Sequence, residues 1–247
     1  MALSGVEGVE PFGDEGAAPL IIFVSIYMCW NENISLNTFI FSSLVLIFIW
    51  YNNTYTQYKV EEFDHWSVYF FFFSYSSMQL VEYFLWKSIK AKDLVKNKLF
   101  SVIGWLLIRV IQPLAILLTL PNKYLTLRNT SLFIYFSLLL IVSIYKQLYN
   151  PVEFITSVDK NTHLLWKWVE LRKYEKILGY LYLSLGFVLA VRLPIIALVT
   201  LVILLYCYFF HYMTWGSNWC WLLNSVLLYF LIKILFVLPY KEYNGLC

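Results

Sequence analysis

The chain has 247 residues and a formal net charge of +3, and 61% of its residues are hydrophobic, 20% aromatic and 13% charged. Soluble domains carry about 25% charged residues, so this composition predicts an integral membrane protein. The small net charge gives no reason to expect nucleic acid as a partner, and we expect the lipid bilayer and a small solute or ion instead. Its four cysteines, without paired spacing, predict neither a metal site nor a disulfide framework; they are Cys29, Cys207, Cys220 and Cys247.

The first 18 residues are small and acidic, with no lysine or arginine. They predict a disordered tail over 1–18. The apolar run at 19–30 is shorter than a helical span requires, which favours an interfacial or re-entrant segment, although whether it crosses the membrane is left open. Because the polar connections are short, residues 19–247 are expected to form a single transmembrane helical domain.

Seven apolar segments follow, each close to the roughly 20 residues that a bilayer requires. The predicted fold is therefore all-α: a polytopic transmembrane helical bundle of seven spans, preceded by the short N-terminal apolar segment. The expected spans are 36–50, 66–86, 99–120, 131–149, 177–191, 194–212 and 218–238.

Lysines and arginines gather in two connections, 87–98 and 146–176. Because such residues accumulate on the cytoplasmic side, these connections are predicted to be cytoplasmic, and so is the N-terminal end of the first full span. Glycosylation sequons at Asn52 and Asn129 fall on the opposite, lumenal side, in agreement with this orientation. The identity of the membrane and the oligomeric state remain open.

Within the second basic connection, Leu164, Leu165, Trp168 and Leu171 recur at helical spacing. Charged residues take the other face. This pattern predicts a basic amphipathic helix on the cytoplasmic leaflet, or a solvated helix that extends the fifth span.

The segment 66–86 is unusual because it carries Gln79 and Glu82 among aromatic residues. An ionisable residue inside such a segment marks a functional site by default. Tyr75, Gln79, Glu82 and Trp86 are spaced four, three and four residues apart, which places them on one helical stripe that points into the bundle.

The predicted topology places two further polar groups at the depth of Glu82. One is the turn between the last two spans, with His211 and Asn218 as candidate binding residues, and the other precedes the first span, with Asn31 and Glu32. Tryptophans at these positions are also typical of an interfacial aromatic belt.

Arg109 and Gln112 lie deeper, inside the third span, where Pro113 interrupts the backbone hydrogen bonds. A buried arginine needs a partner, and Glu82 is the nearest acidic candidate in the membrane. An ion pair between them is one expectation; a purely structural role for these residues, in holding helices together, is the other.

Three short motifs carry a resemblance: Met28-Cys29-Trp30-Asn31, MQLVEY within the second span, and WGSNWCW late in the chain. Together they resemble an uncharacterised multi-pass membrane protein family found in large DNA viruses, protists and some other microbes, whose members often begin Met-Cys-Trp-Ser. The resemblance covers residues 28 to about 225. This chain departs from the pattern in Asn31 and in the residues ahead of Met28. The resemblance implies seven helices and points to the three polar clusters, but it implies no activity.

The leading functional expectation is a small transporter, channel or ligand-binding membrane protein, whose polar cavity opens toward the cytoplasm and needs no cofactor. One alternative is a retinal-binding photoreceptor, because Lys233 in the seventh span occupies the place of the Schiff-base lysine in microbial rhodopsins and heliorhodopsins, although the third span offers no acid. The other is an intramembrane lipid-modifying enzyme that uses Glu82 and His211 as base and acid. An enzyme is the less expected class, because no common catalytic motif occurs.

Overall fold

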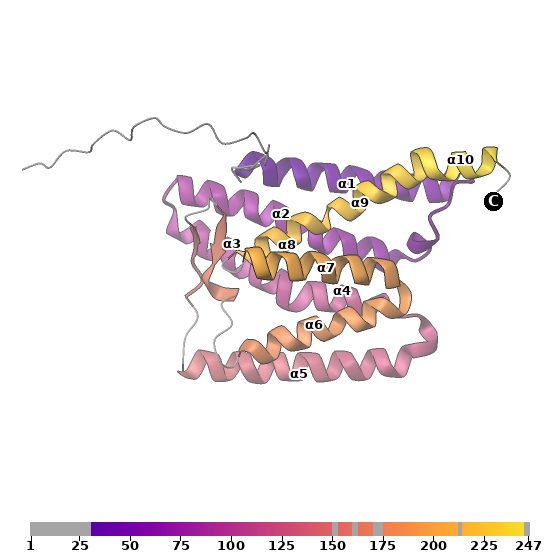
Figure 1. Ribbon diagram of the computed structural model, residues 1–247. Helices are drawn as coiled ribbons and strands as arrows, with labels where there is room; N and C mark the ends of the chain where they lie inside the picture. The colour runs from indigo at the N-terminus through magenta and orange to yellow at the C-terminus, as the bar shows by residue number, and fades with distance from the viewer. Residues whose placement is uncertain (1–30, 150–152, 160–162, 170–174, 212–213, 245–247) are drawn as a thin grey trace, which may run out of the picture.

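The computed structural model describes residues 31–149, 153–159, 163–169, 175–211 and 214–244. The predicted tail 1–18 and apolar segment 19–30 lie outside the described residues. Within the described ranges the chain is mostly helical, as expected, and forms seven long helical segments that lie side by side (Figure 1).

Each helical segment corresponds to one predicted span, but most extend beyond the apolar run from which the span was predicted. Two of the segments contain internal π-helical turns, η2 and η5. In chain order the elements are α1 (Glu32–Tyr55), α2 (Trp66–Lys90), α3 (Leu94–Leu106), η2 (Leu107–Ile111), α4 (Gln112–Leu118), α5 (Leu125–Tyr149), α6 (Glu175–Arg192), α7 (Pro194–Phe210), α8 (Trp215–Leu223), α9 (Ser225–Ile232), η5 (Lys233–Val237) and α10 (Leu238–Tyr243).

Polar caps explain why the first three segments start where they do. The side chain of Asn31 accepts hydrogen bonds from the backbone N–H of Asn33 and Ile34, at 2.9 and 3.2 Å, and thereby starts α1. His65 caps α2, and Asp93 caps α3. Each cap satisfies N–H groups that a helix start leaves without partners.

Both π-helical turns end one residue before an X-Pro pair. The N–H of Gln112 bonds to the carbonyl of Leu107, five residues back, and Pro113 follows. The N–H of Leu238 bonds in the same way to Lys233, and Pro239 follows. Because proline has no N–H and clashes with the carbonyl four residues earlier, the widened turn accommodates the ring inside a continuous helix.

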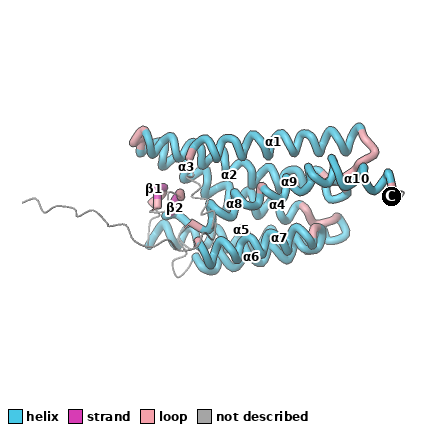
Figure 2. The backbone as a smooth tube through the Cα atoms, turned by 45° about the horizontal axis from the view of Figure 1, so that its top comes forward, coloured by secondary structure: helices cyan, strands magenta, loops and turns pink. Residues whose placement is uncertain are grey.

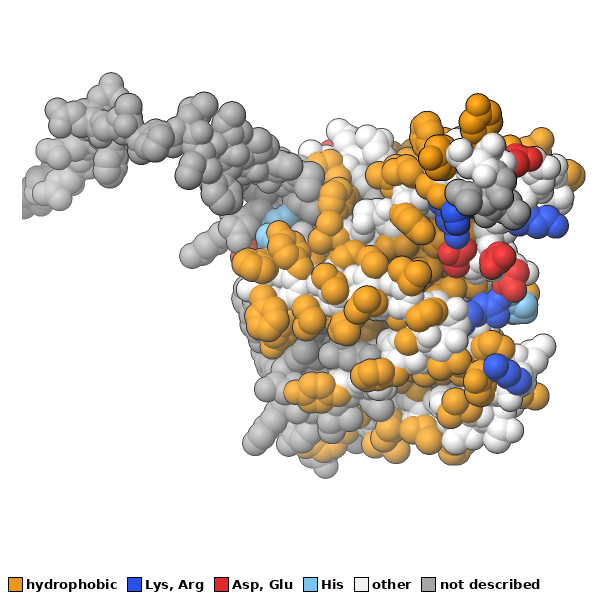
Figure 3. Space-filling view, turned by 45° about the vertical axis from the view of Figure 1, so that its right-hand side comes forward, with side chains coloured by type: hydrophobic (Ala, Val, Ile, Leu, Met, Phe, Trp, Pro, Cys, Tyr) orange, Lys and Arg blue, Asp and Glu red, His pale blue; other side chains and the backbone are white. Residues whose placement is uncertain are grey.

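In the part of the chain that the structure describes, four helices are long and apolar enough to cross a membrane: Glu32–Tyr55, Leu94–Leu118, Asn122–Tyr145 and Gly216–Tyr243. The α7 helix is also apolar but shorter. Figure 3 shows one face of the molecule, where hydrophobic side chains cover the length of the helices and charged side chains gather at one end. These features are compatible with a membrane protein.

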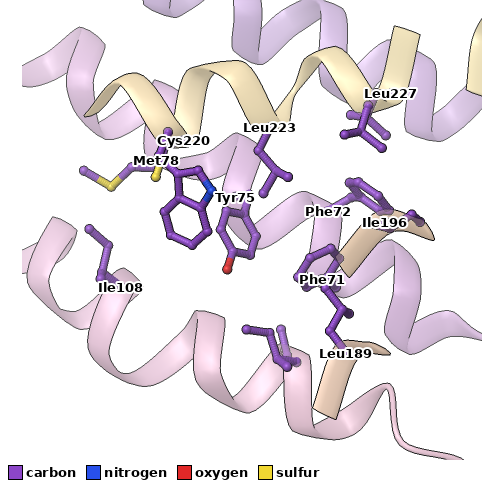
Figure 4. Close-up of a cluster of buried hydrophobic side chains, with 14 of the residues drawn as sticks. Phe71, Phe72, Tyr75, Met78, Ile108, Leu189, Ile196, Cys220, Leu223 and Leu227 are labelled. Atoms are coloured by element: carbon purple, nitrogen blue, oxygen red, sulfur yellow. The ribbon is translucent and has the colours of Figure 1, made fainter. Parts of the chain in front are cut away.

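The α2 helix is central to the packing: 14 of its 25 residues are buried. It contacts α1, α3, α4 and α8. It is less apolar than its neighbours because it carries several serines, Gln79 and Glu82. The surrounding helices bury most of these polar side chains. Figure 4 shows Phe71, Phe72 and Tyr75 of this helix inside the hydrophobic core.

The connection between α5 and α6 contains a β-hairpin, where the sequence predicted an amphipathic helix. Strands β1 (Thr156–Val158) and β2 (Leu164–Trp166) pair antiparallel, and a 3-10 turn, η4 (Lys167–Val169), follows. The prediction was wrong because Leu164, Trp166 and Trp168 are buried and alternate with more exposed residues, which is the period of a strand.

The hairpin docks between helices through two tryptophans and a polar anchor. The indole rings of Trp166 and Trp168 stack, with centroids 5.2 Å apart. Asn97 of α3 holds the backbone of Thr156 with two hydrogen bonds, at 2.9 and 3.0 Å. Figures 1 and 2 show the hairpin at the end of the molecule where α2 meets α3. It therefore covers part of that end.

Asn224, between α8 and α9, ties three helical segments together. Its side-chain oxygen accepts hydrogen bonds from Ser42 at 2.7 Å and from Ser76 at 2.9 Å. We expect Asn224→Leu to lower the free energy of unfolding by about 1 to 2 kcal/mol, because interhelical hydrogen bonds in membranes have that size. Thermal unfolding in detergent measures it, with the exposed Ser225→Leu as control; equal stability of both variants would contradict the bridge.

Candidate functional site

Glu82 of α2 is 1% exposed and faces α1 and α8. Its carboxylate accepts a hydrogen bond from the Ser217 hydroxyl of α8 at 2.7 Å and a longer one from Ser35 of α1 at 3.5 Å. The Ser217 contact is the expected meeting of Glu82 with the 211–221 turn. Neutral hydroxyls surround this carboxylate, and it belongs to none of the ion pairs formed by described residues.

Two buried amides, one beside this carboxylate and one farther along the core, have side-chain atoms without a hydrogen bond to described residues. Gln79 is one turn from Glu82 on the same face, and it lies close enough to interact with that carboxylate. Neither its amide nitrogen nor its oxygen forms a hydrogen bond of normal geometry, and the amide nitrogen of Gln112 is in the same state. Buried polar atoms without partners are uncommon in folded proteins and are a frequent sign of a bound water or ion.

Gln112 connects to the carboxylate through Cys220. The buried thiol of Cys220 faces Gln112 and lies within electrostatic range of Glu82. On its other side, the Gln112 oxygen accepts from the Tyr182 hydroxyl at 2.8 Å, and the hydroxyls of Tyr182 and Tyr75 are 2.6 Å apart. Polar groups from five helical segments thus lie along one path through the core.

Trp219 packs against both tyrosines. Its indole packs edge-on against the rings of Tyr75 and Tyr182, with centroids 5.6 and 5.7 Å away. Aromatic edges that meet ring faces stabilise such an arrangement. The tyrosine hydroxyls are therefore held in a fixed position relative to Gln112.

Arg109 does not join Glu82, so the expected ion pair is absent from the described residues. Since α2 and α3 run antiparallel from the turn at 91–93, Tyr75 shares the depth of Arg109, and Glu82 lies about 10 Å farther along the axis at 1.5 Å per residue. The buried Arg109 side chain instead lies within electrostatic range of Tyr135 and Tyr182.

Tyr135 of α5 compensates for the break that Pro113 makes. The carbonyl of Arg109, four residues before Pro113, accepts a hydrogen bond from the Tyr135 hydroxyl at 3.0 Å. We expect Tyr135→Phe to reduce the free energy of unfolding by about 1 to 2 kcal/mol, because it leaves a buried carbonyl without its donor. Chemical unfolding in detergent tests this, with the exposed Tyr243→Phe as control; identical midpoints would show that the bond contributes nothing.

The remaining predicted site residues lie away from the carboxylate. The ring of His211 lies 5.8 Å from that of His163, at the hairpin end of the molecule. Asn218 donates hydrogen bonds back to Thr214, and Asn31 caps α1. Glu32 pairs with Lys90 at 2.6 Å. The structure thus brings Glu82 and Gln79 together, places Gln112 beside Cys220 and Tyr182, and assigns local structural contacts to Asn31, Glu32 and Asn218.

His163 is a titratable group at the hairpin end. Its side chain is mostly buried, and this burial lowers the pKa of His163, with the nearby His211 lowering it further. The neutral imidazole is therefore favoured near pH 7. No hydrogen bond or ion pair between described residues joins His211 to Glu82, the acid and base of the enzymatic alternative.

Lys233 lies in a charged cleft at the opposite end of the molecule. The cleft has a volume of about 730 Å³. The ammonium of Lys233 contacts both carboxylate oxygens of Glu62, at 2.7 and 2.9 Å, and Arg192 pairs there with Asp64. Lys233 therefore has a carboxylate partner, which comes from the segment before α2 and not from the third predicted span.

Asn52 does not suit a glycosylation acceptor. It lies inside α1, is 3% exposed, and donates a hydrogen bond to the backbone carbonyl of Tyr58. Asn129 lies at the surface of α5. The sequon at Asn52 therefore lends no support to the predicted orientation.

Ser35 and Tyr182 belong to the site although the sequence did not single them out, and Ser217 and Cys220 belong to it as members of the WGSNWCW motif. Each is a small or aromatic polar residue within an apolar helix, where such residues are also common as packing groups. Their position within a polar stripe on facing helices would have been the usable signal. The arrangement can hold a proton or a small cation on a carboxylate, with hydroxyl, amide and thiol groups around it.

Comparison with protein-family models, with curated proteins and with solved structures finds no match to this chain.

Proposed function

We propose that the protein is a seven-span helical bundle in a membrane and acts as a small transporter or ligand-binding protein, in which Glu82 binds and releases a proton or a small cation. The observation that carries this proposal is the environment of Glu82. A carboxylate that is 1% exposed contacts hydroxyls and no lysine or arginine among the described residues. An uncompensated negative charge at such depth is strongly unfavourable, and a bound proton or cation removes it.

The neighbouring amides support a binding role over a purely structural one. Gln79 and Gln112 keep buried amide atoms that form no hydrogen bond of normal geometry with described residues, and a close-packed structural contact would not leave them so. A hydrated proton or cation would satisfy them and connect Glu82 to the Tyr182 hydroxyl. Helix-stabilising polar residues, by contrast, pair with one another, as Asn224 does with Ser42 and Ser76.

The orientation belongs to the same proposal. The end that carries the hairpin also carries the lysines of the 87–98 connection, and basic residues favour the cytoplasmic side. In this orientation the site at Glu82 lies nearer the cytoplasm, and the charged cleft at Lys233 lies on the far side. The hairpin then lies on the cytoplasmic side of the site.

Ion flux into vesicles tests the proposal. We expect the purified protein, reconstituted in vesicles with a pH-sensitive dye inside, to move protons when a potassium gradient and valinomycin set a membrane potential. A second set of vesicles with a sodium gradient and a sodium-sensitive dye covers a cation in place of the proton. Vesicles that show neither flux above empty vesicles would contradict a transport role for Glu82.

A further inference from the structure

The charged cleft around Lys233 is built from four segments that are distant in the sequence. They are the loop before α2, the turn before α5, the α6–α7 turn, and the α9–η5 region. All four lie at the ends of helices, at the end of the molecule opposite the hairpin (Figure 1). If the helices span a bilayer, this is the level of the lipid headgroups.

The cleft carries equal numbers of acidic and basic side chains: Glu61, Glu62 and Asp64 against Lys123, Arg192 and Lys233. Two of each are used in the ion pairs described above. Glu61 and Lys123 form no ion pair with described residues, and the ammonium of Lys123 lies over the ring of Tyr124. A neutral site with both charges available complements a group that itself carries both charges.

The lip of the cleft is apolar and continues onto the outer surface. Ile195 at the start of α7 is 69% exposed, and Tyr229 of α9 is 51% exposed. Beyond them, Leu198 and Ile232 lie exposed along the same two helices. A small soluble solute would leave this apolar surface exposed to water, whereas the acyl chains of a lipid would cover it.

We propose that this cleft binds the phosphate and ammonium headgroup of a zwitterionic phospholipid, with its acyl chains along α7 and α9. Lys123 attracts the phosphate and Glu61 attracts the ammonium, while the pairs Arg192–Asp64 and Lys233–Glu62 line the cleft beside them. The inference rests on the membrane embedding and not on the role of Glu82, so a negative flux experiment leaves it standing.

Lipid binding is measured on the full chain in detergent by native mass spectrometry and by thermal unfolding. The probes are phosphatidylethanolamine, phosphatidylcholine and phosphatidylglycerol with identical acyl chains, and soluble phosphoethanolamine. We expect both zwitterionic lipids to remain bound and raise the unfolding temperature, and the anionic lipid to do so far less. Equal binding of phosphatidylglycerol, or tight binding of soluble phosphoethanolamine, would overturn the lipid proposal.

Two variants separate the cleft from general lipid adhesion. Lys123→Ala and Glu61→Ala remove the charges that form no ion pair, so folding should be unaffected. Each should weaken binding of zwitterionic lipid about five-fold, as expected for one partly exposed charge. Lys59→Ala, an exposed lysine at the same end but outside the cleft, is the matched control. Affinities of all three variants equal to that of the parent protein would refute the site.

Discussion

Glu82→Gln is expected to abolish ion flux and leave the protein folded. Glutamine matches glutamate in shape, and its side-chain oxygen can still accept the Ser217 hydroxyl that lies 2.7 Å from the carboxylate. The free energy of unfolding should therefore change by no more than about 1 kcal/mol. The amide cannot take up a proton, and it carries no charge for a cation. Flux should fall to the level of empty vesicles.

Two variants provide the controls for this experiment. Glu242→Gln makes the same chemical change at an exposed position, where the carboxylate contacts Gln57 and Tyr58, so flux should persist. Lys233→Met should also retain flux, since Lys233 lies in the distant cleft; a folded but inactive Lys233→Met protein would favour the retinal alternative. A Glu82→Gln protein that fails to fold would indicate a structural role for the carboxylate.

Trp168→Ala is expected to cause the largest loss of stability, about 3 to 5 kcal/mol. The indole is fully buried, and its Nε1–H donates to the Thr156 hydroxyl at 3.1 Å. Its ring lies so close to Gly104 that a Cβ there would be 3.1 Å away. The substitution therefore removes the contact that seats the hairpin on α3 and leaves a large cavity.

The matched control for Trp168→Ala is Phe133→Ala on α5, where the ring is 74% exposed. Thermal unfolding in one detergent compares the two variants, and the control should change little. Gly104→Leu provides a second approach to the same contact, because its side chain would displace Trp168 and destabilise the protein by about 1 to 3 kcal/mol. Equal midpoints for the Trp168 and Phe133 variants would contradict the docked hairpin.

The helices could be predicted from the sequence because apolar runs of membrane length have few alternatives. The first residues of the helices could not be predicted in this way. Asn31, His65 and Asp93 cap three of the helices, and capping depends on side-chain hydrogen bonds and not on hydropathy. The hairpin was missed because four apolar residues matched a helical spacing, while the burial of Leu164, Trp166 and Trp168 follows the period of a strand.

Part of the candidate site could be predicted from the sequence. Glu82 and Gln79 could be identified from one helix, because an ionisable residue in an apolar segment is unusual in any fold. Their partners depend on the rotation of neighbouring helices, which the sequence of one chain does not specify. The need of a buried arginine for an acidic partner suggested Arg109 for Glu82, although Arg109 lies deeper, whereas helix rotation presents Ser35 and Ser217 to the carboxylate.

Infrared spectroscopy of the Glu82 carboxyl group tests the central claim most directly. A protonated carboxyl has a carbonyl stretching band that vanishes when the proton leaves or a cation replaces it. We predict one such band in the reconstituted protein that changes with pH or with added sodium, is missing in Glu82→Gln, and persists in Glu242→Gln. A Glu82 band that stays constant across pH and sodium concentration, or no band that depends on Glu82, would contradict the account.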